Sequence, residues 1–259
     1  MQHIACVSFG KDSLATVILA KEHGEPLDAV VYSEVMFDRD TSGEVPEHRD
    51  FIYNVAIPKL ESWGIPTLVL RAEKTFLDCF YHKKTKSKIP ERNGKYYGFP
   101  MVGGCVINSR CKSPPLDSFI HSHPKVKEYV GIAADEPKRL KRLDGSRKIS
   151  LLAKYGVTEQ GAAELCKRHG LLSPVYDFSS RNGCWFCPNA SYRELRHLRN
   201  YHPELWKKLL DLQGEPNIVC KGKFRFRESL FDIEDMFANE DAQMCFEEYL
   251  KICGKKADT

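Results

Sequence analysis

The sequence has no apolar run long enough to cross a membrane. Nowhere in its 259 residues does an uncharged stretch approach the roughly 20 residues of a transmembrane helix. The basic, apolar and small-residue pattern of a signal peptide is absent at the N-terminus, and there is no internal repeat or low-complexity segment. The net charge of +4 is too mild to indicate a nucleic-acid partner by itself. We therefore expect no membrane partner and a cytoplasmic location.

Composition indicates an α/β protein in a reducing compartment. Ten cysteines without a secretory signal are expected to be thiols, metal ligands or catalysts rather than disulfides. A chain of this length with 42% hydrophobic residues supports one large domain with a small appendage. We expect a nucleotide-binding α/β part over residues 1–179 and a helical C-terminal region over residues 180–259.

The chain is organised around an N-terminal strand, loop and helix. Ile4 to Val7 is an apolar run suited to a buried strand, and apolar residues at helical spacing follow from Leu14. The first N–H groups of a helix lack internal partners and the helix dipole is positive there, so the intervening loop suits a phosphate chain. Its candidate binding residues are Ser8, Phe9, Gly10, Lys11, Asp12 and Ser13. An ordinary capped strand–helix turn is the alternative interpretation.

The residue types in this loop fit anion binding. Gly10 lets the backbone approach an anion, Lys11 supplies positive charge, and Asp12 either caps the helix or orients a metal. The loop matches neither G-x-x-x-x-G-K-[ST] nor G-x-G-x-x-G.

Residues 8–13 do resemble the pyrophosphate-binding loop of the ATP pyrophosphatases and the phosphoadenylylsulfate reductase family. The resemblance implies a Rossmann-like, doubly wound parallel sheet of the adenine nucleotide α-hydrolase type. It also implies ATP as ligand, held or cleaved between its α- and β-phosphates. The phenylalanine at the second position is typical of the reductase-like branch.

Later strands predict the rest of a ligand cleft. Strands are expected over residues 28–33, 67–70 and 126–134, and in a parallel sheet ligands bind beyond the carboxyl ends of strands. Ser33 and Glu34 therefore fall beside the loop, where backbone groups can meet an adenine. In the alternative, the acidic segment after them is only a solvated loop.

Residues 131–139 are similar to the family pattern G-x-x-x-[DE]-[ES]-x-x-R. Asp135 and Arg139 are expected to order each other and to face the nucleotide. A helix-capping aspartate with surface basic residues is the alternative. The candidate catalytic residues are Lys11, Asp12, Asp135 and Arg139, and Arg139 is also a candidate for nucleotide binding.

Periodicity and capping signals predict several helices. The expected ranges are 46–63, which Pro58 should kink or split, then 73–81, 158–169 with a threonine cap, 192–212 with Pro203 opening its second half, and 241–253. Residues 217–231 alternate basic and aromatic side chains, which suits an edge strand or a loop. Residues 82–97 gather seven basic side chains with aromatic neighbours, which suits contact with a polyanion, a lid over a nucleotide, or a solvated loop.

Two cysteine pairs suggest a metal site. Cys184 and Cys187 form a C-x-x-C hairpin, while Cys105 and Cys111 enclose five residues. Four such thiolates suit tetrahedral Zn²⁺ or a [4Fe–4S] cluster. A redox dithiol at the hairpin, and a buried apolar role for the first pair, are the alternatives. The other cysteines are expected to be structural thiols: Cys6, Cys79, Cys166, Cys220, Cys245 and Cys253.

The hairpin also resembles that of reductase-like proteins of DNA phosphorothioation, which implies an iron–sulfur cluster. We hypothesise an ATP-binding enzyme that adenylylates an acceptor, using Mg²⁺ and releasing pyrophosphate, and then transfers sulfur to it. The acceptor is a nucleic acid or a small molecule, and a sulfur-donor protein is an expected partner. The Glu-Cys-Gly-[Ile/Leu]-His segment of sulfonucleotide reductases is absent. A reductase using a hairpin cysteine, and a non-enzymatic nucleotide- or nucleic-acid-binding module with structural zinc, are the alternatives.

Overall fold

The computed structural model describes residues 2–100, 104–219 and 223–254, and the side chains as far as Cys245. The chain forms two compact units. Unit 1 comprises residues 1–79 and 106–185, and unit 2 comprises residues 80–105 and 186–259. These units are defined by contacts between residues and not by independent folding. The predicted boundary between two domains at residue 180 therefore stays a prediction.

Unit 1 contains a parallel five-stranded sheet with the order β3-β2-β1-β4-β5. The strands are β1 (His3–Val7), β2 (Ala29–Glu34), β3 (Thr67–Arg71), β4 (Lys127–Tyr129) and β5 (Lys148–Ile149). The predicted α/β fold with a parallel sheet is confirmed. The fourth strand is shorter than the predicted range 126–134. Its continuation at Gly131 packs against the backbone of residues 12 and 13 instead of extending the ladder.

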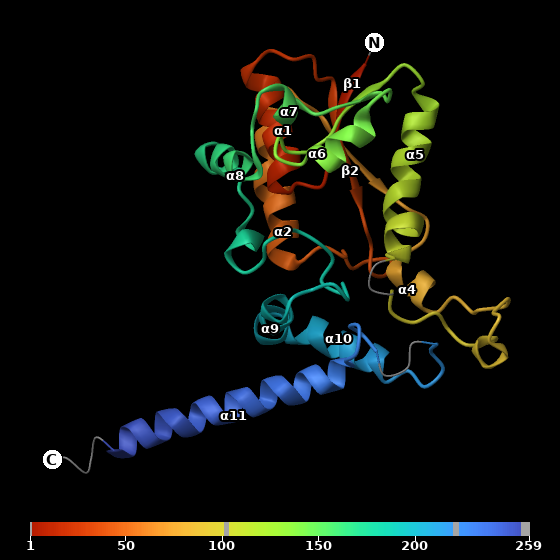
Figure 1. Ribbon diagram of the computed structural model, residues 1–259, viewed down its shortest axis with the longest axis vertical. Coiled ribbons are helices and arrows are strands. Elements are labelled where there is room, and N and C mark those ends of the chain that lie inside the picture. Colours follow the sequence, from red (N-terminus) through yellow and green to blue (C-terminus); the bar gives the residue numbers. More distant parts are fainter. Residues whose placement is uncertain (1, 101–103, 220–222, 255–259) are drawn as a thin grey trace. The chain divides into compact units, whose positions relative to one another are not determined.

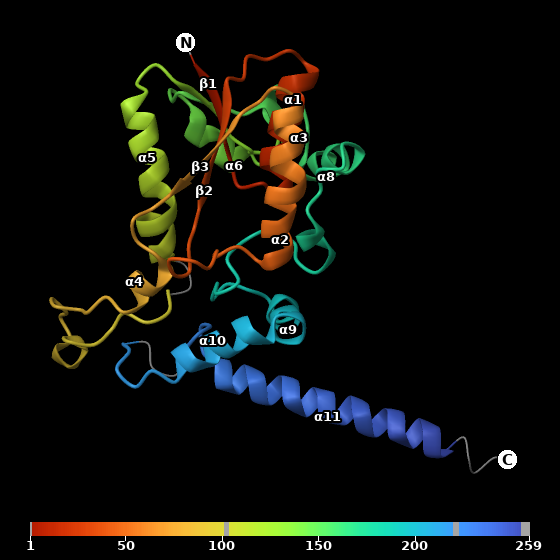
Figure 2. The same ribbon diagram turned by 180° about the vertical axis from the view of Figure 1, so that it is seen from behind.

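Helices cover both faces of this sheet (Figures 1 and 2). The helices of unit 1 are α1 (Lys11–Glu22), α2 (Pro46–Phe51), α3 (Ile57–Ser62), α4 (Phe76–Phe80), α5 (Ser113–Ser122), α6 (Pro137–Leu140), α7 (Leu151–Lys154) and α8 (Glu159–Arg168), the last residue of α4 belonging to unit 2. On one face, Ala5 and Val7 join a core with α1, α3 and α8. On the other, Ile4 and Val31 pack with residues of α5. Because both faces are buried, successive residues of the central strands are apolar.

Two helices of unit 1 contain a π-helical turn, and prolines explain both. A π turn at Ile52–Ala56 joins α2 to α3 just before Pro58, which confirms the predicted break. A second π turn, at Asn108–Lys112, comes directly before α5, and Pro114 and Pro115 lie in the first turn of that helix. Proline has no N–H to donate within a helix, so the preceding turn widens.

The described part of unit 2 contains the helices α9 (Tyr192–Tyr201), α10 (Pro203–Gln213) and α11 (Leu230–Gly254), joined by irregular segments. Pro203 opens α10, as predicted. The last helix begins earlier than the predicted residue 241, because the Ser229 hydroxyl and the Asp232 carboxylate cap it reciprocally. Residues 217–219 and 223–229 form a loop and no strand.

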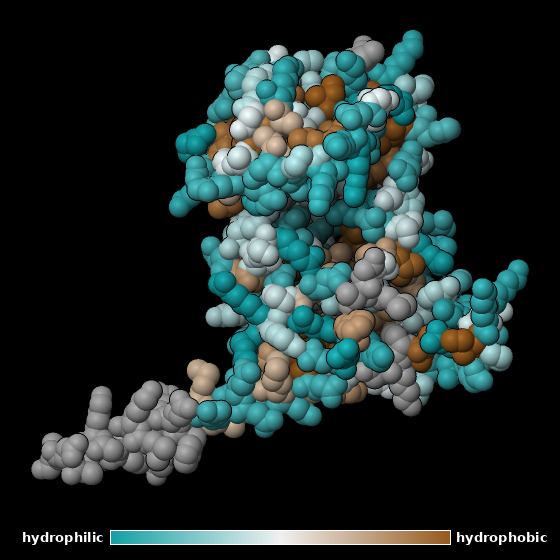
Figure 3. Space-filling view, in the orientation of Figure 1, coloured by the Kyte–Doolittle hydropathy of each residue, from teal (hydrophilic) through white to brown (hydrophobic). Residues whose placement is uncertain are grey.

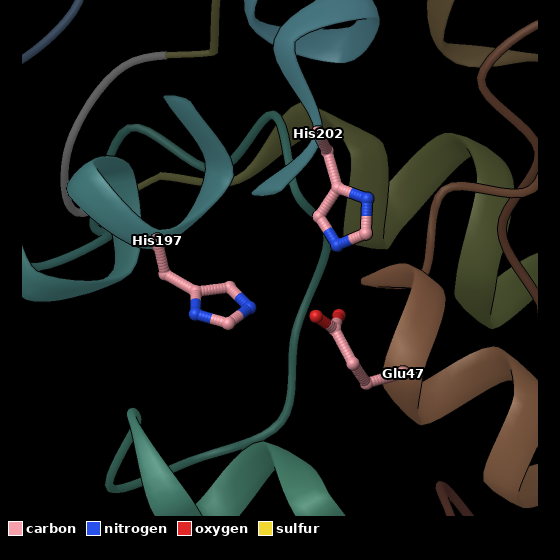
Figure 4. A group of neighbouring side chains, drawn as sticks. All are labelled: Glu47, His197 and His202. Atoms are coloured by element: carbon pink, nitrogen blue, oxygen red, sulfur yellow. The ribbon is translucent and has the colours of Figure 1, made fainter. Parts of the chain in front are cut away.

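Two histidines of unit 2 lie near each other (Figure 4). His197 projects from α9 and His202 lies between α9 and α10, with ring centroids 6.0 Å apart.

The surface is mainly polar. On the face drawn in Figure 3, brown hydrophobic residues show in patches between teal hydrophilic ones. Within the described residues, no helix is both long enough and apolar enough to cross a membrane.

Candidate functional site

Ser8–Ser13, the loop between β1 and α1 that the sequence predicts to bind phosphate, is called the phosphate loop from here on. As predicted, it lies between a buried strand and a helix, with α1 beginning at Lys11. Phe9 has a φ of 56°, the one positive value of a non-glycine residue in the described chain. Its ring is fully buried and contacts Tyr32 edge-on at 5.1 Å. The side chain of Phe9 therefore belongs to the core, and only its backbone is available to a ligand.

Two side chains from distant segments hold the carbonyl of Ser8. Asn182 donates from Nδ2 at 2.8 Å, and His48 Nε2 lies 3.1 Å away. His48 Nδ1 contacts the hydroxyl of Ser173 at 2.8 Å. Burial lowers the pKa of His48 against the opposing effect of Glu44, so the ring is neutral near pH 7. A neutral ring donates from Nε2 to Ser8 and accepts the serine proton at Nδ1.

The start of α1 is fixed by further contacts. The N–H of Lys11 donates to the hydroxyl of Tyr176 at 2.9 Å. The Ser13 hydroxyl donates to the carbonyl of Gly10 at 2.9 Å and accepts from the N–H of Ser8 at 3.3 Å. The hydroxyl of Ser13 thus closes the loop.

Two glycines permit this packing. A Cβ on Gly10 would lie 2.8 Å from Asn182 Oδ1 and 3.1 Å from the Tyr176 hydroxyl. A Cβ on Gly131 would lie 2.6 Å from the nitrogen of Ser13 and 2.7 Å from the carbonyl carbon of Asp12. The segment after β4 therefore contacts the phosphate loop directly.

Lys11 and Asp12 lie in a compact set of charges. Lys11 Nζ contacts Asp12 at 2.8 Å and Glu159 at 3.1 Å. Burial opposes the charge on Lys11, yet these hydrogen bonds outweigh it and raise its pKa above the usual range. Burial also raises the pKa of Asp12, and the charges of Glu159 and Glu136 raise it further against the effect of Lys11. The partly buried ammonium of Lys11 thus pairs with two carboxylates beside the loop, and the charge of Glu136 also acts on Asp12.

Asp135 and Arg139 follow β4, but they do not pair with each other. The carboxylate of Asp135 accepts from the N–H of Glu159 at 3.1 Å, at the start of α8. Arg139 pairs with Glu136 at 2.6 Å, and Glu136 also accepts from the N–H of Ala133. Arg139 therefore pairs with Glu136 instead of the predicted Asp135. Asp135 instead caps a helix, which was the alternative interpretation of this residue.

Ser33 and Glu34 use their side chains internally. The Ser33 hydroxyl donates to the carbonyl of Lys112 at 2.7 Å. The carboxylate of Glu34 is fully buried and accepts from Ser42, Tyr53 and Arg71. Only the backbone groups of Ser33 and Glu34 could therefore contact an adenine, as the sequence analysis expected.

Unit 1 also brings cysteines together. Cys79 and Cys111 lie 3.6 Å apart between their sulfurs, and both are buried. The charge of Cys184 acts on Cys111, raising the pKa of Cys111 further beyond the effects of Cys79 and burial. Cys79 and Cys111 thus form a buried thiol pair. Cys105 and Cys187 belong to unit 2, so the site predicted from Cys105, Cys111, Cys184 and Cys187 stays a prediction.

The other cysteines differ in accessibility. Burial raises the pKa of both Cys6 and Cys166 to about 12, as expected for structural thiols. Cys245 is exposed. Cys220 and the side chain of Cys253 lie outside the described residues.

Sequence reasoning missed His48, Asn182 and Glu159 at the loop, and the position of Cys79 beside Cys111. None of these residues belongs to a local sequence motif. The one signal in the sequence was that His48 lies three residues before Phe51, on the apolar face of the predicted helix over residues 46–63.

Comparison with known proteins gives remote relatives. No family model matches the chain. It is 25% identical over 255 residues to the uncharacterised nin region protein ORF290 of Escherichia phage lambda, covering 85% of this chain and 80% of that protein. It is 21% identical over 248 residues to an uncharacterised protein of Methanocaldococcus jannaschii, covering 85% of this chain and 51% of that protein. The chain thus spans about half the length of the second relative.

A solved structure is also similar: the U34-tRNA thiolase NcsA from Methanococcus maripaludis with its [4Fe–4S] cluster. The identity is 15% and the TM-score 0.41, with 82% of this chain and 72% of that chain covered. A likeness at this level carries no argument about the activity or cofactors of this chain.

Proposed function

We propose that this chain is an ATP-dependent enzyme that transfers the adenylyl group of ATP to an acceptor and then supports transfer of sulfur. The observation that carries the proposal is the phosphate loop. It lies at the carboxyl ends of parallel strands, where the strand order reverses between β1 and β4. Ligands of open α/β sheets bind at this position.

The loop is built to present donors to an anion. Its Ser8 carbonyl is turned toward His48 and Asn182, while the positive φ of Phe9 reverses the chain before the helix. The N–H of Lys11 donates to Tyr176, so the N–H groups that follow it in the first turn of α1, together with the Lys11 ammonium, are the donors that we propose face the phosphates. Charged hydrogen bonds of this kind contribute roughly 1.5–3 kcal/mol each.

Mg²⁺ needs only one or two protein carboxylates when it is also bound by the phosphates of its substrate. Asp12, in the loop itself, is the carboxylate that would supply such a ligand. Mg²⁺ bound there would neutralise charge on the leaving pyrophosphate. The Lys11 ammonium, which pairs with Asp12 and Glu159 in this structure, would act on the same charge.

The reaction balances without an oxidant. An acceptor oxygen attacks the α-phosphorus, the bond to the bridging oxygen breaks, and pyrophosphate leaves with the electron pair. A sulfur nucleophile at the sulfide oxidation level then attacks the carbon that bears the adenylylated oxygen. The C–O bond breaks, AMP leaves with the electron pair, and a C–S bond remains on the acceptor. A nucleic acid or a small molecule is the acceptor in this proposal, and a donor protein supplies the sulfur.

The cysteines support the sulfur half of the proposal. The sequence resemblance of the 184–187 hairpin implies a [4Fe–4S] cluster, and Zn²⁺ is the alternative. Thiolates fit either metal. In unit 1, Cys79 and Cys111 are two buried thiols whose sulfurs lie 3.6 Å apart.

Binding of ATP with Mg²⁺, measured by calorimetry, tests the proposal without knowledge of the acceptor. Lys11→Ala should weaken binding at least tenfold, corresponding to the loss of about 1.5 kcal/mol. The matched control is Lys21→Ala, an exposed lysine in the last turn of the same helix, which should leave binding unchanged.

Two other outcomes decide against the proposal. A folded wild-type protein that does not bind millimolar ATP would refute it. Sulfite released from a sulfonucleotide in the presence of thiol, without pyrophosphate release from ATP, would identify a reductase instead.

A further inference from the structure

We propose that a positively charged pocket between the end of β3 and the start of α5 binds a phosphate group of the acceptor. The inference deepens the proposed function and rests on it for the reaction, because it names the chemical class of the acceptor. The pocket and the phosphate loop share no residue. Binding at the pocket can therefore fail while ATP binding stands, and the converse.

The pocket lies within unit 1, on the side of β3 that α5 covers in Figure 2. Its volume is about 560 Å³, and ligand sites commonly have volumes of about 300–1,000 Å³. Three cations, one carboxylate and two hydroxyl groups stand in its lining. These residues are Arg71, Lys74, Arg110, Glu73, Ser109 and Ser118.

A buried carboxylate holds Arg71 in place. Its Nε and Nη2 both donate to Oε2 of Glu34, at 2.8 and 2.7 Å, and the Glu34 side chain is fully buried. Among the described residues, Nη1 of Arg71 makes no hydrogen bond, and this side chain is 52% exposed. A guanidinium fixed along one edge can bind an oxyanion with its remaining donors and loses little further freedom.

Lys74 supplies a second charge to the pocket. It is exposed, and in the part of the chain that the structure describes its ammonium makes no hydrogen bond and no ion pair. Glu73 in the lining and the buried Glu34 offset two of the three positive charges, so an excess of positive charge remains. A concave surface with one sign of charge attracts ions of the opposite sign.

The end of β2 fixes both walls of the pocket. Glu34 holds Arg71 at the end of β3, and the neighbouring Ser33 donates from its hydroxyl to the carbonyl of Lys112 at 2.7 Å. Lys112 ends the π turn that carries Arg110. Two consecutive residues of β2 thus position cations from two distant chain segments. A wall held in this way is already arranged before a ligand arrives, which reduces the cost of binding.

The register of the strands relates the pocket to the phosphate loop. Val7, Tyr32 and Val69 pair in one row across β1, β2 and β3. The phosphate loop begins directly after Val7, and Arg71 lies two residues after Val69. Neighbouring strands are about 4.8 Å apart, so the ends of β1 and β3 are separated by about 10 Å. A phosphate in the pocket would therefore lie beside ATP on the same edge of the sheet.

Phosphate is the anion that this set of groups favours. Arginine binds phosphate oxygens through paired hydrogen bonds, and lysine acts on them as a point charge. The backbone of a nucleic acid and a phosphorylated small molecule both carry phosphate esters. These are the two classes of acceptor in the proposed function, and the test distinguishes them.

Two probes are titrated into the full-length protein without ATP. One is a short fluorescein-labelled single strand of mixed sequence, as DNA and as RNA, followed by fluorescence anisotropy. The other is glycerol phosphate, a monoester without a base, followed by calorimetry. We expect Lys74→Gln and Arg110→Gln each to weaken binding about tenfold, which corresponds to the loss of one charged hydrogen bond. For the labelled strand, the slope of log affinity against log salt should fall by about 1.

Matched variants separate the pocket from general charge. Lys74→Arg keeps the charge and should restore binding. Lys125→Gln removes an exposed lysine two residues before β4, at the opposite edge of the sheet, and should leave binding unchanged. Circular dichroism and urea unfolding check that each variant is folded.

The outcome also identifies the source of the phosphate. Binding of the labelled strand alone, weakened by Lys74→Gln, supports a nucleic acid, and equally sensitive binding of glycerol phosphate supports a small molecule. Folded Lys74→Gln and Arg110→Gln that bind the probes as tightly as Lys125→Gln would overturn the proposal. Wild-type protein that binds neither probe at millimolar concentration would do the same.

Discussion

Replacing Gly131 with alanine tests whether the phosphate loop must keep its observed position. The added Cβ would lie 2.6 Å from the nitrogen of Ser13 and 2.7 and 2.9 Å from the carbonyl carbon and oxygen of Asp12. Real Cβ contacts at such distances are essentially never seen, and 3.4 Å marks ordinary contact. Because the crowded atoms are backbone, the start of α1 must shift by roughly the 0.8 Å difference.

This displacement has two expected consequences. Overpacking a well-packed site costs about 1–3 kcal/mol of unfolding free energy. Misplacing binding groups by about 1 Å costs up to about 100-fold in function. We therefore expect Gly131→Ala to fold with reduced stability in urea and to bind ATP with Mg²⁺ about 10- to 100-fold more weakly in calorimetry.

The control is Gly104→Ala, because a Cβ there meets nothing within 4 Å. It should change neither quantity. Wild-type affinity for ATP in Gly131→Ala would refute the reasoning, whether or not its stability falls, because it would show that binding does not depend on the position of the loop.

Two further predictions concern buried charges. Because burial lowers the pKa of His48, the unfolded chain binds a proton below about pH 6.5 that the folded protein resists. The unfolding free energy should therefore fall as the pH drops from 7 to 5. His48→Gln should flatten that dependence in urea unfolding, and an unchanged slope would contradict this account. Arg71→Gln removes the charged partner of the fully buried Glu34 carboxylate and should cost about 2–3 kcal/mol of unfolding free energy. The exposed Arg92→Gln should cost less than about 0.5 kcal/mol, and equal losses in both variants would disprove the importance of the pair.

Features that depend on neighbouring residues could be predicted from the sequence. The strand, loop and helix around residues 8–13 follow from an apolar run, a polar interruption and a helical period. Thr158 caps α8 through its hydroxyl, and Pro203 opens α10, because capping and proline geometry act within one turn.

Features that depend on tertiary contacts could not be predicted from the sequence. Cys79 has no partner near it in sequence, and only the fold brings it to Cys111. Asn182 reaches Ser8 across most of the chain. The choice between Asp135 and Glu136 as the partner of Arg139 depends on the backbone after β4, which spacing does not resolve.

The interleaving of the two units has a consequence for synthesis on the ribosome. Residues 80–105 leave the ribosome before the second half of unit 1, but the rest of their own unit begins only at residue 186. Unit 1 can be completed first, since domains emerging early generally fold first. The basic and aromatic segment 82–97 is therefore synthesised before most residues of its own unit, and we expect its lysines to oppose association during that interval. The charge of this segment is then expected to matter during synthesis even without a ligand.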